Sequence, residues 1–142
     1  MGRTARSAIR TYMSAKILIV DDDPDILIAL TLILESQDYE VVTARDGLEG
    51  LGKVKMDVPD LLILDLMMPR MDGFAVCKEL QKPEWAKYQH IPTLILTSVR
   101  EEASKRRYEL EMGVTLGADS YIEKPIYPDV LLENVGRLLE KK

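Results

Sequence analysis

Cysteine, tryptophan, phenylalanine and histidine each occur only once in the 142 residues of this chain. Because Cys77 is the single cysteine, an internal disulfide bond and a metal site built from several thiolates are both excluded. We therefore expect a protein of a reducing, cytoplasmic compartment.

Long hydrophobic runs are also missing. The apolar runs, such as residues 61–64, are far shorter than the roughly 20 residues that a membrane-spanning helix needs. No apolar block of a signal peptide follows the arginines near the N-terminus. The sequence thus predicts a soluble protein with no membrane partner.

Positive charge is in deficit, with 19 Lys and Arg against 24 Asp and Glu and a formal net charge of −5. Proteins that bind along a nucleic-acid backbone need an excess of basic residues, so direct nucleic-acid binding is disfavoured. What the chain does have is 46% hydrophobic residues, enough for one compact core.

The N-terminal residues 1–15 contain three arginines and little apolar periodicity. We interpret them as a disordered leader or a remnant of cloning. The folded domain is then expected at residues 16–142.

From residue 16 onward, short apolar runs alternate with segments in which apolar residues recur every three or four positions. Unbroken apolar strands that alternate with helices indicate a parallel sheet covered on both faces. We predict strands at residues 17–20, 39–43, 61–64, 93–96 and 120–122. Helices are predicted around the stripe at 26–34 and at 48–55, 74–81, 101–112 and 128–140.

Polar residues follow four of these strands. They are Asp21 and Asp22 after the first strand, Asp65 after the third, Thr97 and Ser98 after the fourth, and Lys124 and Pro125 after the fifth. Ligands of open parallel sheets bind beyond the carboxyl ends of the strands. We therefore expect these scattered side chains to converge on one edge of the sheet.

This set of side chains suits phosphoryl transfer. Crowded carboxylates repel one another, and ligation by oxygen alone is what Mg²⁺ prefers. A carboxylate such as Asp65 can attack phosphorus to form an acyl phosphate, provided that a metal and an ammonium group neutralise the charge. Lys124 can supply the ammonium group and Thr97 a hydrogen bond.

Other residues receive simpler interpretations. Asp23, which precedes Pro24, is predicted to cap a helix, and Asp60 and Asp72 are predicted to be turn or cap residues. Residues 82–90 contain both the single Trp and His90, and we predict a loop packed by its own aromatic residues. His90 lies away from the proposed site, so the phosphoryl donor is expected to be another molecule.

Four short motifs stand in order at the strand ends. They are Ile19-Val20-Asp21-Asp22, Leu62-Ile63-Leu64-Asp65-Leu66-Met67-Met68-Pro69 with Met71-Asp72-Gly73, Leu96-Thr97-Ser98, and Tyr121-Ile122-Glu123-Lys124-Pro125. From residue 16 to about 140, the chain closely resembles the CheY-like response-regulator receiver domains of two-component signalling. The resemblance implies a flavodoxin-like, doubly wound α/β fold whose five parallel strands take the order 2-1-3-4-5, with helices on both faces.

The resemblance also implies a role for each acidic residue of the site. Asp65 would be the phosphoacceptor. Asp21 and Asp22 would form the acidic pocket that holds Mg²⁺ together with Asp65 and the backbone carbonyl of Met67.

The remaining site residues would bind the phosphoryl group or respond to it. Lys124 would contact the phosphoryl oxygens, and the Lys124–Pro125 bond would be cis. By the same resemblance, Thr97 would move toward the phosphoryl group, Ser98 would leave room for the donor, and Tyr121 would swing inward as the readout. Such a switch biases two pre-existing conformations.

The implied partners are a sensor histidine kinase or phosphotransfer protein, and a downstream protein target or a fused output domain. A phosphorylation-linked homodimer is a further possibility, and the chain would be a stand-alone receiver or the N-terminal part of a larger regulator.

As a phosphoacceptor switch it would perform at most self-catalysed phosphotransfer and autodephosphorylation. Met67 and Val99 cannot orient an attacking water, which predicts slow hydrolysis. The segment between Thr97 and Gly117 is longer than is usual in the family, which bears on partner recognition.

Two alternatives remain open. In a haloacid-dehalogenase-like phosphatase, Asp21 would be the nucleophile and Asp23 the general acid, but that family needs an acidic pair after a later strand, where this chain has Glu123-Lys124-Pro125. The other alternative is an interaction module that keeps the fold without being phosphorylated.

Overall fold

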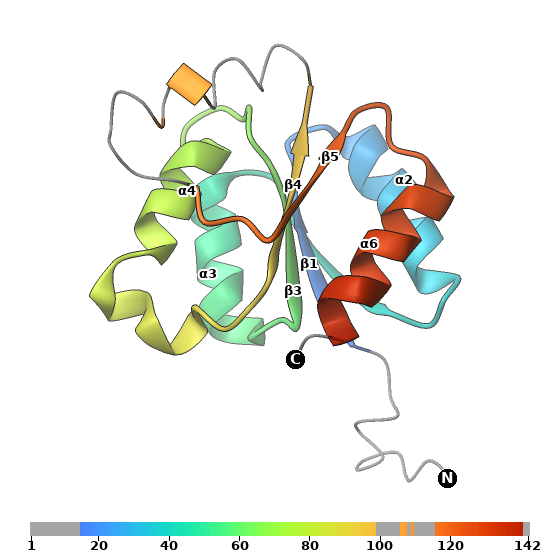
Figure 1. Ribbon diagram of the computed structural model, residues 1–142, viewed down its shortest axis with the longest axis horizontal. Helices are drawn as coiled ribbons and strands as arrows, with labels where there is room; N and C mark the ends of the chain where they lie inside the picture. The colour runs from blue at the N-terminus through green and yellow to red at the C-terminus, as the bar shows by residue number, and fades with distance from the viewer. Residues whose placement is uncertain (1–14, 99–105, 108, 110–115, 141–142) are drawn as a thin grey trace, which may run out of the picture.

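The structure of the chain is a computed structural model that describes residues 15–98, 106–107, 109 and 116–140 (Figure 1). Five parallel strands form one sheet in the order β2-β1-β3-β4-β5, which confirms the predicted doubly wound fold. The strands are β1 (Lys16–Val20), β2 (Glu40–Ala44), β3 (Leu61–Asp65), β4 (Thr93–Thr97) and β5 (Ser120–Glu123).

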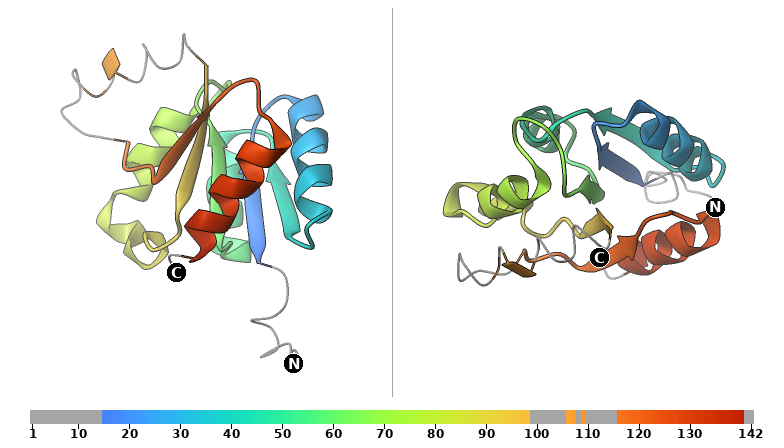
Figure 2. Two further views of the ribbon diagram at one scale, coloured as in Figure 1. Left: turned by 45° about the vertical axis from the view of Figure 1, so that its right-hand side comes forward. Right: turned by 90° about the horizontal axis from the view of Figure 1, so that it is seen from above.

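Helices cover both faces of this sheet. They are α2 (Pro24–Glu35), α3 (Gly47–Asp57), α4 (Gly73–Leu80), the 3₁₀ helix η1 (Pro83–Tyr88) and α6 (Pro128–Glu140). Figure 1 shows α3 and α4 on one side of the sheet and α2 and α6 on the other, and the view from above in Figure 2 shows the same layers. Within the described part of the chain, no helix has the length and apolar character needed to cross a membrane.

Alternate residues of each central strand face opposite layers, because side chains point to opposite faces of a strand in turn. Ile17 and Ile19 of β1 pack in the apolar cluster that α2 and α6 complete, whereas Leu18 and Val20 pack in the cluster of α3 and α4. All four side chains are fully buried. The unbroken apolar runs of the sequence are therefore explained by burial on both faces.

The predicted start of the second strand is wrong by one residue. The N–H of Tyr39 donates to the carbonyl of Leu34 at 3.2 Å and so helps to end α2. Pairing with β1 begins at the next residue, where the N–H of Glu40 donates to the carbonyl of Ala15 at 2.9 Å. Ala15, which directly precedes β1, thus contributes a backbone acceptor to the first residue of β2.

Parts of two predicted segments fall outside the described residues. Of the predicted helix at 101–112, only Arg106, Arg107 and Glu109 are described, and they are helical. The predicted leader is described only at Ala15. Val99 also lies outside the described residues.

The aromatic packing predicted for residues 82–90 is confirmed, but the segment forms a 3₁₀ helix, η1, where a loop was predicted. Pro83 begins this helix, a position where its missing N–H costs nothing. The Trp85 side chain is 5% exposed, its indole N–H donates to Glu79 at 2.8 Å, and its ring centroid lies 5.6 Å from that of Tyr88. His90 is exposed.

Val58, at the C-terminal end of α3, provides a test of backbone strain. It has the left-handed φ of 43° although it is β-branched, and its side chain is 49% exposed. Val58→Gly should therefore raise the free energy of unfolding by about 1 kcal/mol, as measured by urea denaturation. Val58→Ala, which keeps a Cβ atom, is the control, and an equal gain in both variants would contradict this explanation.

Candidate functional site

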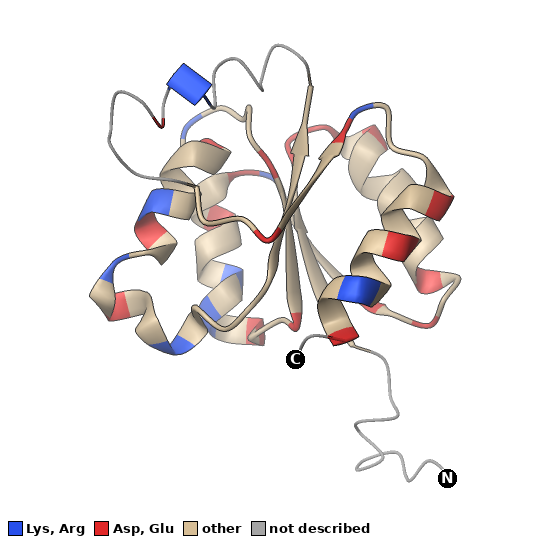
Figure 3. Ribbon diagram, viewed as in Figure 1, with Lys and Arg blue, Asp and Glu red and all other residues tan. Residues whose placement is uncertain are grey.

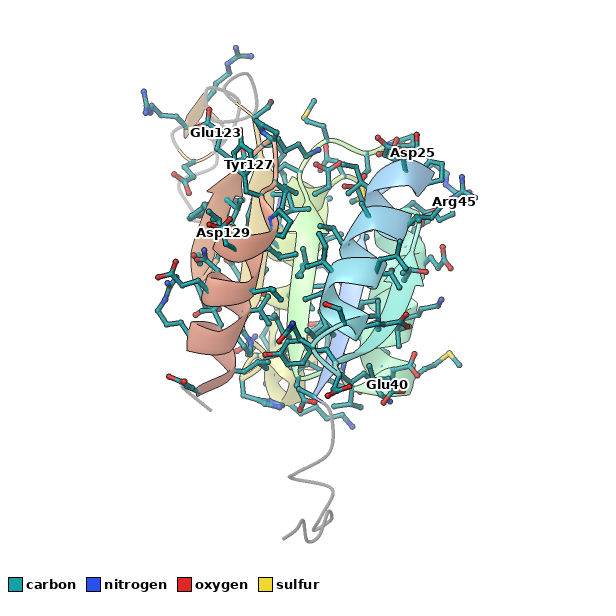
Figure 4. The ribbon with its side chains drawn as sticks, turned by 90° about the vertical axis from the view of Figure 1, so that its right-hand side faces the viewer. Asp25, Glu40, Arg45, Glu123, Tyr127 and Asp129 are labelled. Carbon is teal, nitrogen blue, oxygen red and sulfur yellow. The ribbon has the colours of Figure 1, made fainter. Side chains whose placement is uncertain are left out.

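The sheet topology brings the predicted site residues to one edge. Val20 pairs with Leu64, so that Asp21 and Asp65 follow at the same level of neighbouring strands. In Figure 3 acidic segments gather at the end of the sheet where β1 and β3 stop, near the basic segment that follows β5. Figure 4 shows Arg45 and Glu123 at this end and Glu40, which begins β2, at the opposite end.

Three carboxylates form a compact acidic cluster at this edge. One oxygen from each of Asp21, Asp22 and Asp65 lies within 4.8 Å of the other two. Asp21 is fully buried and Asp65 is 2% exposed, while Asp22 is the most accessible of the three. The cluster is therefore built into the sheet and opens to solvent on the side of Asp22.

Burial makes the ionised form of Asp21 costly. It raises the pKa of this carboxyl group from 3.8 to about 6, and the negative charges of Asp65 and Asp22 add to the increase. The backbone N–H of Asp23, which donates to Asp21 Oδ1 at 3.0 Å, and the charge of Lys124 offset only part of this effect.

The other oxygen of Asp21, Oδ2, is buried without a hydrogen-bond partner among the described residues. A buried carboxylate oxygen normally has a partner, and this atom fits the role of a cation ligand. Because all the side-chain donors of the cluster are oxygen atoms, the group fits a hard divalent cation better than a soft one.

Lys124 supplies the positive charge of the site. Its Nζ lies 3.1 Å from Asp65 Oδ1, and its backbone N–H donates to the carbonyl of Thr97 at 2.6 Å. Burial raises the pKa of Asp65, and the nearby ammonium group opposes that shift. The Lys124–Pro125 peptide bond is cis.

Thr97, at the end of β4, lies beside Asp65 and Lys124. Asp65 pairs with Leu96 in the sheet, so Thr97 is one residue further along the neighbouring strand. Its side chain is 1% exposed, and its hydroxyl donates to the carbonyl of Ser98 at 3.2 Å. The hydroxyl is thus turned to the backbone in this structure.

Two of the predicted site residues lie further from the centre of the acidic cluster. Tyr121 lies within β5 beside Ile95, and its side chain is 36% exposed. Met67 is 45% exposed and contributes a backbone hydrogen bond that lowers the pKa of Asp65. The side chain of Met67 is therefore outside the buried acidic cluster, while its backbone adjoins it.

The predicted structural roles of Asp23 and Asp72 are confirmed. The side chain of Asp23 accepts from Asp25 N at 2.9 Å and caps α2, and that of Asp72 accepts from Ala75 N at 3.0 Å and caps α4. Asp60 accepts from Lys16 N at 2.7 Å before β3 begins.

Sequence reasoning missed one buried acidic residue near the site. Asp46 is 4% exposed, caps α3 through Glu49 N at 2.9 Å, and forms an ion pair with the Arg70 guanidinium. The Asp46-x-x-Glu49 spacing is a signal for the cap. No signal pairs it with Arg70, which lies in another loop.

A family model described as the response regulator receiver domain matches residues 17–136 of this chain. The chain therefore belongs to the response regulator receiver family. It is a receiver domain of two-component signalling, a class of phosphoacceptor switches.

Individual relatives agree with this family. The chain is 40% identical over 129 residues to the alkaline phosphatase synthesis transcriptional regulatory protein PhoP of Bacillus subtilis, covering 91% of this chain and 50% of PhoP. It thus spans about half the length of the curated relatives it matches.

Solved structures show the same fold. A putative response regulator from Chloroflexus aurantiacus superposes with a TM-score of 0.75 at 34% identity, covering 89% of this chain and 98% of that one. The signal receiver domain of a histidine kinase from Syntrophus aciditrophicus gives a TM-score of 0.75 at 36% identity, covering 90% and 92%.

The burial of Asp21 predicts a pH-dependent stability. The folded state holds a proton on Asp21 up to about pH 6, whereas the unfolded chain loses it near 3.8, so the carboxylate destabilises the fold progressively as the pH rises between these values. Without divalent cations, Asp21→Asn should raise the free energy of unfolding at pH 7 by on the order of 2–3 kcal/mol.

Urea denaturation in EDTA at pH 7 and at pH 4 measures this effect. The gain should be several-fold smaller at the lower pH, where Asp21 is protonated in the folded state. Asp25→Asn, an exposed change in the first turn of α2, is the control and should show no such gain. A stabilisation by Asp21→Asn that is equal at both pH values would contradict the electrostatic explanation.

Proposed function

We propose that this chain accepts a phosphoryl group on Asp65, in a Mg²⁺-dependent reaction with a sensor histidine kinase or a phosphotransfer protein. The observation that carries the proposal is the setting of Asp65. Its carboxylate lies at the end of β3, 3.1 Å from the Lys124 ammonium group and within the cluster that contains the unpartnered oxygen of Asp21.

Asp21, Asp22 and Asp65 are the side chains that would hold Mg²⁺, with the backbone carbonyl of Met67 as a further ligand. Bound there, the cation would supply positive charge to the carboxylates and to the phosphoryl oxygens. The oxygen-only donor set and the orphaned oxygen of Asp21 support this assignment.

Asp65 would attack the phosphorus atom, forming an O–P bond as the bond from phosphorus to the donor's imidazole nitrogen breaks. Lys124 favours the ionised, nucleophilic form of Asp65 before transfer. After transfer, its ammonium group would contact a phosphoryl oxygen in place of the carboxylate. Ser98, next to Thr97, would leave room for the donor.

The response would begin at Thr97. Its hydroxyl would turn from the carbonyl of Ser98 toward the phosphoryl group, and Tyr121, which is 36% exposed, would move inward as the readout. Each movement selects one of two conformations that the domain already samples. The chain would act as a switch with at most self-catalysed phosphotransfer and autodephosphorylation.

The output would be a downstream protein target or a fused output domain, with phosphorylation-linked homodimerisation as a further mode. PhoP, which is about twice as long as the matched region, is named a transcriptional regulator. We assign the receiver to residues 16–142, treat the preceding residues as a leader, and propose a cytoplasmic location.

The phosphatase alternative finds no support in the site. Its general acid would be Asp23, but that carboxylate already accepts a hydrogen bond from Asp25 N and caps α2. The family model that matches this chain is also that of the receiver domains.

Acetyl phosphate and Mg²⁺ should place one acid-labile phosphate on the chain, and Asp65→Asn should abolish it because an amide cannot act as the nucleophile. Peptide mapping after borohydride reduction locates the modified residue. Asp60→Asn, at the opposite end of β3, is the matched control and should retain the label.

The other outcomes separate the alternatives. Label on Asp21 would favour the phosphatase, and absence of label with no binding of Mg²⁺ or beryllofluoride would favour an interaction module that is not phosphorylated.

The acyl phosphate should hydrolyse slowly. Met67 lies two residues after Asp65, and its thioether cannot orient an attacking water as an amide can. Loss of acid-labile phosphate over time measures the lifetime, and Met67→Asn should shorten it. A lifetime of seconds in the unmodified chain would contradict the prediction.

A further inference from the structure

The loop between β3 and α4, residues 66–72, contains no helix or strand. It nevertheless carries Met67, whose backbone donates to Asp65 and whose carbonyl we assign to the metal. The position of that carbonyl depends on how the loop is anchored.

Backbone contacts hold the loop at two points. The N–H of Gly73 donates to the carbonyl of Leu66 at 2.9 Å, and the N–H of Gly47 donates to the carbonyl of Met71 at 3.0 Å. A Cβ atom at Gly47 would overlap the Met71 carbonyl oxygen. The first turn of α3 is therefore in close contact with the far end of the loop.

One side-chain contact joins the same two elements. Asp46, the cap of α3, uses one carboxylate oxygen to accept from Glu49 N and the other to bind the guanidinium group of Arg70 in the loop. The Asp46 side chain is 6% exposed, and the ion pair with Arg70 compensates for its burial. Removing Arg70 alone would leave Asp46 Oδ2 buried and without its ion pair.

Arg70 occupies a backbone conformation that suits glycine. Its φ is 66°, a region that costs a residue with a Cβ atom roughly 1–2 kcal/mol. Its side chain is 69% exposed, so burial does little to offset that cost. The described contact that holds this side chain is the ion pair with Asp46.

We propose that Arg70 and Asp46 form a clasp that fixes the loop after Asp65 against the start of α3 and thereby positions the Met67 carbonyl for Mg²⁺. This proposal rests on the proposed function, in which Mg²⁺ binds at the acidic cluster. Arg70 and Asp46 are positioning residues, because they act through Met67 and touch neither the metal nor the phosphoryl group.

The double variant Arg70→Gly with Asp46→Asn tests the clasp. It leaves the net charge of the chain unchanged, keeps an oxygen to cap α3, and places glycine at the positive φ. Titration with MgCl₂, followed by amide signals in NMR spectra, should show a Kd about tenfold higher than that of the wild type, the low end of the effects of supporting residues on metal affinity.

Phosphorylation by acetyl phosphate gives a second readout. The double variant should need more Mg²⁺ for half-maximal rate but reach the wild-type rate at saturating Mg²⁺, because the nucleophile and Lys124 are unchanged. A merely structural role would alter the urea midpoint and leave the Mg²⁺ dependence as it was.

Val58→Gly is the control, since it introduces glycine at a positive φ at the opposite end of α3 and should leave the Kd for Mg²⁺ unchanged. Arg70→Lys, which keeps a charge but loses the planar guanidinium group, should give an intermediate Kd. An unchanged Kd in the double variant, or a lower rate at saturating Mg²⁺, would overturn the clasp. In that case, labelling of Asp65 in the wild type would still support the proposed function. Failure of the wild type to bind Mg²⁺ would overturn both.

Discussion

The repulsion among carboxylates buried at the carboxyl end of the sheet is the constraint on which the site depends. Asp21 is fully buried, one of its oxygens has no partner among the described residues, and Asp65 lies beside it on the next strand. Such an arrangement opposes folding, because desolvation and like charges both disfavour the ionised groups. It persists because the surrounding structure holds the backbone of both residues in place.

That structure is the sheet with its two apolar layers. Residues 17–20 and 61–64 are almost completely excluded from solvent, and each strand contributes to the clusters on both faces. The stability of these layers fixes where β1 and β3 end, and so sets the spacing of the carboxylates. The instability at the edge can then be relieved by a proton, by a cation or by the ammonium group of Lys124.

The sequence predicted the fold and the convergence of the site for the same reason. Parallel strands end at a common edge, so a polar residue after each apolar run is placed by the topology alone, as with Asp21, Asp65 and Lys124. The ion pair between Asp46 and Arg70 could not be predicted, since both residues lie in loops and their contact depends on loop geometry. The start of β2 was misplaced because Tyr39, a good strand former, is used to end α2.

Lys124 links the chemistry of the site to the far edge of the sheet. Its side chain pairs with Asp65 on β3, while its backbone N–H bonds the carbonyl of Thr97 at the end of β4. A phosphoryl group on Asp65 would compete for the ammonium group, and the same phosphoryl group would offer a new acceptor to the Thr97 hydroxyl. Both changes act on residues that adjoin β5, so a local change of charge at β3 would reach Tyr121 through two strands that share hydrogen bonds.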